Sequence, residues 1–249
     1  MAEHMTGLTE QLQTFFGRIR LRDTLGEEEE QALVEAASER ITFAAGEDLV
    51  TEGDRPTRSI LLTRGYACRY RLQKGGGRQL MAIHLPGDFV DLHSLLIKEM
   101  DHSVGALTEC AIITFPHDRL VRVTERFPHL TRMLWLLTLI DASCHREWLA
   151  GMGLLSAAQR TAHLICEIYV RLEVVGLASG HKFNFPITQA ALADAVGISA
   201  VHINRVVQEL RQRDLISWEN GLLTIHDWQA LVATADFNDR YLHLVKEQR

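Results

Sequence analysis

Residues 187–216, ITQAALADAVGISAVHINRVVQELRQRDLI, carry the most specific pattern in the chain. Thr188 stands before a short apolar run and Gly197 after it, which predicts a capped helix that ends in a tight turn. Ser199 is the expected cap of a second helix, in which apolar residues recur at helical spacing while the first two turns also carry polar side chains. Two short helices joined through a glycine turn are typical of a helix-turn-helix.

The residues after this stretch predict a β-hairpin. LISWENGLLTIHD contains Asn220–Gly221, the strongest two-residue hairpin signal. Together these elements predict a winged helix-turn-helix, whose second helix enters the major groove of DNA and touches base edges with its N-terminal residues. We therefore interpret His202, Asn204 and Arg205, in the first two turns, as base-reading residues. Arg205 can form two hydrogen bonds to one guanine.

Each of these residues also has a plain structural interpretation. Thr188 and Ser199 are expected to bind phosphates together with backbone N–H groups, but they serve as helix caps in either case. His202 is equally well explained as a solvent-exposed histidine, and Arg205 stands four residues before Glu209, which offers an ion pair. The predicted DNA-binding residues are Thr188, Gln189, Ser199, Val201, His202, Asn204, Arg205 and Gln208.

The composition is that of an ordinary globular protein. Of the 249 residues, 47% are hydrophobic and 23% are charged. Two domains are the natural expectation for this length. The net charge of −6 argues against attraction of the whole molecule to nucleic acid. The charge is uneven, however: from Ser156 onward nine Lys/Arg stand against ten Asp/Glu, and before it seventeen against twenty-two. Local basic faces near the C-terminal end therefore remain compatible with DNA binding.

No metal site, membrane span or export signal is expected. The four cysteines lack ligand spacing and are expected to be free thiols, mostly small core side chains. No apolar run approaches the roughly 18 residues of a membrane span, and the first residues lack the basic-then-apolar order of a signal peptide. These features predict a cytoplasmic protein.

Between Ile41 and Phe115 the sequence pattern differs from that of the residues before it. Short β-branched or aromatic runs such as SILLTRGYACRYRL alternate with glycine-rich turns such as KGGGR and LPGDF. This alternation predicts an antiparallel barrel or roll of short strands, and helical periodicity precedes it over residues 10–40.

A long helix is predicted from Pro128 to Gly151, where Gly151 and Gly153 are expected to end it and to provide a hinge. Its apolar residues alternate at spacings of four and three, the pattern of a helix that packs along a partner helix. We interpret this stripe as a dimer interface; the alternative is a helix buried within its own domain. The stripe comprises Met133, Leu137, Ile140 and Cys144.

With these parts in place, the sequence resembles the CRP/FNR family of bacterial transcription regulators over nearly its whole length. The resemblance rests on GEDLVTEGD and LPGDFVDLHSLL in the roll, on LSAAQRTAHLI after the long helix, and most specifically on residues 187–216. It implies an α+β fold: an N-terminal helical segment and cyclic-nucleotide-binding-like β-roll (1–127), a dimerisation helix and hinge (128–153), and a winged helix-turn-helix (154–249). It also implies a homodimer on a pseudo-palindromic operator in double-stranded DNA, with RNA polymerase as a further partner.

Residue by residue, the resemblance points away from the cyclic AMP-binding members. Arg205 falls on the arginine that reads guanine, but Val201 falls where many members carry a cytosine-reading glutamate, so a thymine methyl is its expected contact. In members that bind cyclic AMP, the segment after GDF supplies a glutamate for the ribose and an arginine–serine pair for the phosphate. Those positions here hold Leu92, His102 and Ser103, and histidine has a pKa of about 6.5. Cyclic AMP is therefore not the expected effector.

No cofactor is predicted, and the residues do not select another effector. The oxygen-sensing branch carries an N-terminal cysteine cluster, whereas this chain has no cysteine before Cys68. His84, His93 and His102 recur at intervals of nine, which is not a ligand motif. We interpret them as polar residues that line the pocket or as surface histidines; the alternative is that they bind haem or a metal ion. The predicted effector-pocket residues are Asp88, Leu92, His93, His102 and Ser103.

An enzyme is not expected. The chain has no phosphate loop, nucleophile elbow, HExxH motif or paired carboxylates in an apolar setting, so no catalytic residue is predicted. The alternative to a DNA-binding regulator is an allosteric module of cyclic-nucleotide-binding type whose C-terminal part contacts proteins. The polar start of the second helix and the hairpin favour DNA.

Overall fold

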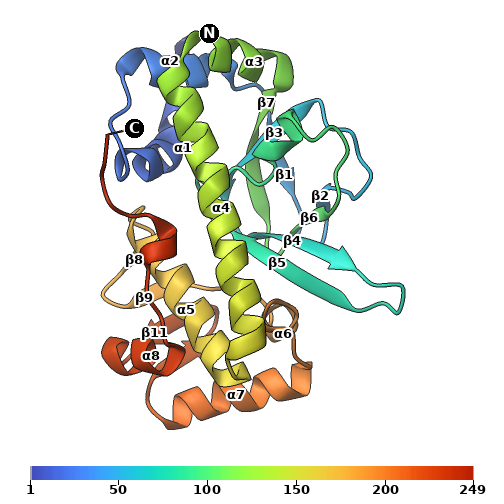
Figure 1. Cartoon of the computed structure of the whole chain (residues 1–249), viewed down its shortest axis with the longest axis vertical. Helices are drawn as coiled ribbons and strands as arrows, with labels where there is room; N and C mark the ends of the chain where they lie inside the picture. Colours follow the sequence, from blue (N-terminus) through green and yellow to red (C-terminus); the bar gives the residue numbers. More distant parts are fainter. Residues whose placement is uncertain (1, 249) are drawn as a thin grey trace. The chain divides into compact units, whose positions relative to one another are not determined.

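The computed structural model describes residues 2–248, whose backbone is drawn in Figure 1. These residues form two compact units. The first comprises the chain up to Tyr70, Ile83–Ala142 and the segment from Leu244 onward. The second comprises Arg71–Ala82 and Ser143–His243.

The first unit contains the predicted antiparallel roll. Its strands are β1 (Arg40–Phe43), β2 (Asp48–Val50), β3 (Arg58–Arg64), β4 (Ala67–Leu72), β5 (Arg78–His84), β6 (Ser103–Ala106) and β7 (Cys110–Pro116). They form two sheets, of order β1-β7-β3 and β2-β6-β4-β5. The tip of the β4–β5 hairpin belongs to the second unit, in which Arg78 Nε donates to Asp194 Oδ2 at 2.8 Å.

Helices pack against the roll within the same unit. They are α1 (Ala2–Arg20), α2 (Glu27–Ala36), the short 3₁₀ helix η1 (Leu92–Leu95) and α3 (His117–Arg126). Phe15 and Phe16 of α1 are fully buried and join one apolar cluster with Leu61 of β3 and Phe115 of β7. Burying each such side chain contributes about 1.5–3 kcal/mol. A second buried cluster fills the roll itself.

A single long helix, α4 (Pro128–Leu154), follows α3. It begins at Pro128 as predicted, because proline suits the first turn of a helix. The helix does not end at Gly151, since Leu155 N donates to Gly151 O at 2.9 Å. A glycine costs a helix only about 1 kcal/mol, which the continuing hydrogen bonds offset. The break comes instead just before Ser156, which caps the next helix.

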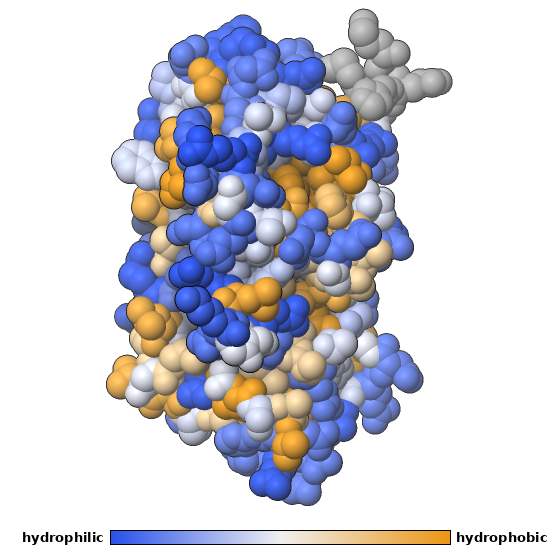
Figure 2. All heavy atoms as spheres, turned by 90° about the vertical axis from the view of Figure 1, so that its right-hand side faces the viewer, coloured by the Kyte–Doolittle hydropathy of each residue, from blue (hydrophilic) through white to orange (hydrophobic). Residues whose placement is uncertain are grey.

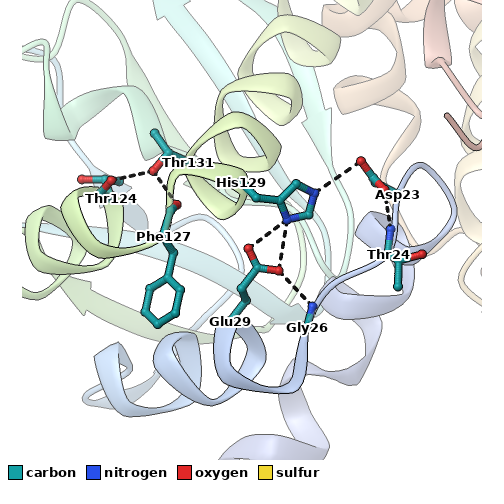
Figure 3. Close-up of polar contacts among 8 residues, drawn as sticks. All are labelled: Asp23, Thr24, Gly26, Glu29, Thr124, Phe127, His129 and Thr131. Atoms are coloured by element: carbon teal, nitrogen blue, oxygen red, sulfur yellow. Dashed lines mark hydrogen bonds and ion pairs between the residues drawn. The ribbon is translucent and has the colours of Figure 1, made fainter. Parts of the chain in front are cut away.

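The start of α4 is held by the N-terminal helices (Figure 3). His129 Nδ1 lies 2.8 Å from Glu29 Oε1 of α2, and His129 Nε2 lies 3.3 Å from Asp23 Oδ2. Partial burial disfavours the protonated imidazole, but the two carboxylates outweigh it and raise the pKa of His129. Glu29 Oε2 also accepts from Gly26 N at 2.9 Å. One carboxylate therefore caps α2 and anchors α4.

The second unit contains the predicted winged helix-turn-helix. Its further elements are α5 (Ala157–Glu173), β8 (Ala178–Ser179), β9 (Lys182–Asn184), α6 (Gln189–Val196), α7 (Ala200–Gln212), β10 (Ile216–Glu219), β11 (Leu222–Ile225), α8 (Trp228–Ala235) and η2 (Arg240–Leu242). β10 and β11 form the predicted hairpin, and Asn220 and Gly221 both have positive φ angles. This is the sign that the favoured two-residue turn requires at both positions. Roll, long helix and winged helix-turn-helix confirm the predicted α+β fold class.

The surface mixes polar and apolar side chains. On the face drawn in Figure 2, apolar residues form separate patches among hydrophilic ones. Among residues 2–248 no single helix is long and apolar enough to cross a membrane; by length and composition alone, the bent pair α6 and α7 would pass when taken together. Cys68, Cys110 and Cys166 are buried, as expected of small core side chains, and Cys144 is half-buried.

Candidate nucleic-acid interface and sensor site

α6 and α7 have the geometry of a helix-turn-helix. They are bent by 98° to each other. Gly197 between them has a positive φ, a left-handed conformation that glycine adopts without strain. Thr188 Oγ1 caps α6 by accepting from Ala191 N at 3.1 Å. Ser199 Oγ caps α7 by accepting from His202 N at 3.2 Å. Both predicted caps are confirmed, and they fix which residues occupy the first turns of α7.

α7 has one buried side and one exposed side. Ile203, Val206 and Leu210 are buried, whereas the predicted DNA-binding side chains of this helix are exposed. Those exposed residues are Val201, His202, Asn204, Arg205 and Gln208. Four of them stand at positions i, i+3, i+4 and i+7, so they follow one face of the helix. Val201 is the first residue of this face, and its apolar side chain is 66% exposed.

Asn204 and Arg205 differ in how they are held. Asn204 Nδ2 donates to Gln189 Oε1 of α6 at 3.0 Å, a link between the two helices that the sequence pattern did not reveal. Within the described part of the chain, Arg205 forms no hydrogen bond or ion pair through its side chain. Glu209, which the sequence offers as an ion-pair partner of Arg205, has its Oε1 3.8 Å from Nη1 of Arg213 instead. The guanidinium of Arg205 is therefore available to an outside ligand.

The arginines at the end of α7 are tied to their own unit. Arg211 Nη2 donates to the carbonyl of Trp218 in β10. Arg213 Nη2 donates to Thr234 Oγ1 of α8 at 2.8 Å. Both side chains therefore hold neighbouring elements on α7, a structural task that Arg205 does not share.

The exposed apolar side of α4 is not the predicted dimer stripe. Met133 (1% exposed) and Ile140 (8%) are buried in their own chain, Leu137 packs against the apolar cluster beneath α1, and Cys144 is half-buried. Met133 and Ile140 therefore pack within their own chain, and the helix side through which a second copy would bind stays a prediction. The large apolar side chains of α4 that are exposed are Trp135, Leu139, Leu149, Met152 and Leu154.

Three of the predicted effector-pocket residues are engaged within the roll and its helices. Asp88 forms an ion pair with Arg18 of α1 at 3.1 Å. Leu92 belongs to the apolar cluster beneath α1. Ser103 Oγ accepts from Glu52 N at 3.0 Å. The serine expected to bind a phosphate is therefore bonded to the backbone of the roll.

The two remaining pocket residues, His93 and His102, lie together. Their ring centroids are 5.1 Å apart, and the Nε2 atoms of both are buried without a hydrogen-bond partner among residues 2–248. His102 Nδ1 donates to Asp101 Oδ1 at 2.5 Å, because a carboxylate can only accept. Burial, followed by the charge of Arg69, lowers the pKa of both histidines, that of His93 to about 4. Both imidazoles are therefore neutral at pH 7.

A buried arginine that the sequence pattern did not single out lies beside this pair. Arg69 of β4 is 5% exposed, its Nη1 donates to Asp141 Oδ2 of α4 at 2.8 Å, and its Nη2 lies 3.4 Å from Val90 O. Arginine is almost never buried unless it is paired, so Asp141 explains this burial. Burial also raises the pKa of the neighbouring Asp91 to about 7, although a hydrogen bond from Ile60 N favours the ionised form.

Both units of the chain are similar to domains of known proteins. A Crp-like helix-turn-helix domain matches residues 159–234, and a cyclic nucleotide-binding domain matches residues 40–127. The transcriptional activator protein FnrL of Cereibacter sphaeroides is 25% identical over 194 residues, 77% of either chain. The nitrogen fixation regulation protein FixK of Bradyrhizobium diazoefficiens is 26% identical over 189 residues, 76% of this chain and 78% of that one. The solved structure of FixK2 from Bradyrhizobium japonicum shares the fold, with a TM-score of 0.72, 18% identity, and coverage of 80% and 96% of the two chains.

The residues of the roll do not fit the cyclic nucleotide that the second of these domains implies. Leu92 offers no acceptor to a ribose hydroxyl, and burying that hydroxyl unpaired is costly. The resemblance aligns His102 with a phosphate-binding arginine, but burial lowers the pKa of His102, and the buried cation nearby, Arg69, is paired with Asp141. In the part of the chain that the structure describes, no three His, Cys, Asp or Glu side chains are grouped so that they could hold a metal ion.

Proposed function

The chain belongs to the CRP/FNR family of transcription regulators, and we propose that it binds a pseudo-palindromic DNA operator as a homodimer. Its relatives are regulators rather than enzymes. The observation that carries the proposal is Arg205, an exposed and unpaired guanidinium, among the described residues, in the second turn of the second helix of a helix-turn-helix. Such a group can form two hydrogen bonds with guanine in the major groove.

The neighbours of Arg205 support a distinct half-site. Val201 cannot accept a hydrogen bond from cytosine, and its exposed methyl groups suit contact with a thymine methyl. His202 and Asn204 add polar groups on the same exposed end of α7. Thr188 and Ser199 cap helix starts whose backbone N–H groups are suited to phosphate oxygens.

The proposed dimer forms through the exposed side of α4. Trp135 is 65% exposed and Leu139 is 49% exposed. Their spacing of four places them on one face of the helix. Burying both against a second copy of this chain would remove them from water. The dimer would present two copies of α7 to the operator and act with RNA polymerase in the cytoplasm, where bacterial DNA lies.

Replacing Arg205 with Ala is expected to weaken operator binding by about 1–3 kcal/mol and to relax the preference at one base position of each half-site. Arg205 makes no contact that the fold needs, so the circular dichroism spectrum is expected to stay unchanged. Fluorescence anisotropy with the operator and its single-base variants measures both effects. Arg213→Ala removes the same charge from a residue bonded to Thr234 and serves as the matched control, with base preference retained. Unchanged selectivity in Arg205→Ala would place base reading elsewhere.

A further inference from the structure

We propose that the Arg69–Asp141 ion pair takes the place of a bound effector: it fastens β4 of the roll to α4 and supports operator binding without a small-molecule ligand. The inference rests on the proposed DNA-binding function. It adds that two residues of the chain, rather than a bound ligand, hold the sensor site in the state that binds the operator.

The ion pair joins two elements that are distant in the sequence. Arg69 and Asp141 are 72 residues apart, and 6% of the Arg69 side chain is exposed, against 33% for Asp141. Removing one partner of a buried pair leaves an uncompensated charge, which is strongly unfavourable. The guanidinium therefore holds α4 at a fixed position on β4 within the first unit.

Arg69 also lies beside the segment of the roll from which a nucleotide would need hydrogen-bonding groups that are not already paired. Arg69 Nη2 is 3.4 Å from Val90 O, directly before the segment in which Leu92 replaces a ribose-binding glutamate. An anionic ligand in this place would have to compete with Asp141 for Arg69. The pair thus supplies, from within the chain, the link between roll and α4 that a ligand touching both would otherwise supply.

His93 and His102 leave this link undisturbed at neutral pH. Both imidazoles are uncharged because burial and Arg69 lower their pKa, so neither competes with Arg69 for Asp141. The other charged or titratable groups at the cluster are Asp91, which Arg69 helps to ionise, and Asp101, which accepts from His102. Because neutral His102 carries its proton on Nδ1, its buried Nε2 can accept a hydrogen bond but cannot donate one to an anion.

The test uses the full-length protein, purified without added ligand, and an operator duplex selected with the wild type. Asp141→Asn removes the charge of a one-third exposed side chain. It is expected to lower operator affinity roughly 5- to 150-fold, the usual range for coupling between two sites. Asp141→Glu keeps the carboxylate and is expected to retain most of the affinity. Asp118→Asn, which breaks the exposed Arg122–Asp118 pair of α3, is the matched control and is expected to bind like the wild type.

A double-mutant cycle tells whether Arg69 and Asp141 support operator affinity through their shared ion pair or independently of each other. Arg69→Met combined with Asp141→Asn is expected to bind no more weakly than the weaker single variant, because both changes break one interaction. Folded Asp141→Asn protein with wild-type affinity would overturn the inference, as would additive losses in the cycle. Calorimetry with inorganic phosphate is expected to show no binding, and binding that raises wild-type operator affinity would also overturn it. If the wild type bound no operator at all, the proposed function itself would fail instead.

Discussion

Replacing Leu139 with Glu is expected to convert the dimer into monomers and to lower operator affinity by about 10²–10⁴-fold, because a dimer that binds two half-sites gains this much over one half-site. Leu139 is half-exposed and lies outside the apolar cluster of the first unit, so the monomer can carry the charge without unfolding. At a helix–helix seam, the same carboxylate would be buried without a partner. Sedimentation velocity measures the assembly, and gel shift measures operator binding.

Two comparisons make the Leu139 result specific. Val121→Glu introduces the same charge at a 42% exposed apolar residue of α3 and is expected to leave both dimer and affinity unchanged. Ile140→Glu, a change within the stripe predicted from the sequence, is expected to disrupt the fold itself, because Ile140 is buried in its own chain and a buried unpaired charge is costly. A Leu139→Glu protein that still sediments as a dimer would move the interface away from this side of α4.

Cyclic AMP is expected to bind about 30-fold to several thousand-fold more weakly than it would to a site with a charged phosphate partner, since a buried phosphate left without one loses about 2–5 kcal/mol. Leu92 recovers none of this, because it offers no acceptor to the ribose. His102 recovers a part only when it is protonated. Burial and Arg69 lower the pKa of His102 below its ordinary value of 6.5, so residual binding is expected to stay flat down to that pH and to strengthen only below it.

Calorimetry with cyclic AMP and cyclic GMP, at pH 7 and in mild acid, measures this prediction. Circular dichroism at each pH controls for acid unfolding. Low-micromolar binding of either nucleotide at pH 7, accompanied by a rise in operator affinity, would contradict it.

The helix-turn-helix could be predicted from the sequence because its determinants are local. Thr188 and Ser199 cap the helices that they precede, Gly197 takes the left-handed turn, and Asn220–Gly221 closes the hairpin. Each of these features depends on backbone groups a few residues away. The hydrogen bond between Asn204 and Gln189 escaped prediction because it joins two helices across the turn.

The long helix shows where a periodic pattern is insufficient. Spacings of three and four identify an apolar side of α4, but they do not say whether that side meets its own domain or a partner. Met133 and Ile140 are buried in their own chain, and the less regular Trp135 and Leu139 are exposed. The sequence therefore predicted the helix, but not which of its apolar residues its own domain buries.

The sensor site was the least predictable part, because its chemistry depends on long-range pairing. A charged residue in a strand is ordinarily expected to face solvent. Arg69 is buried only because Asp141, 72 residues later, reaches it from α4. The strand β4 carries two arginines, and only the burial of the run Ala67–Tyr70 distinguishes Arg69 from the exposed Arg71. An arginine in such a position indicates a buried partner without identifying it.

Selection of duplexes from a random pool by the wild-type protein tests the central claim most directly. We expect enrichment of a pseudo-palindrome whose half-sites are centred about one helical turn apart, roughly 34 Å, without any added nucleotide. Each half-site is predicted to contain a guanine whose replacement weakens binding in the wild type and not in Arg205→Ala. Recovery of no common sequence would contradict sequence-specific DNA binding and favour a module that acts through protein contacts.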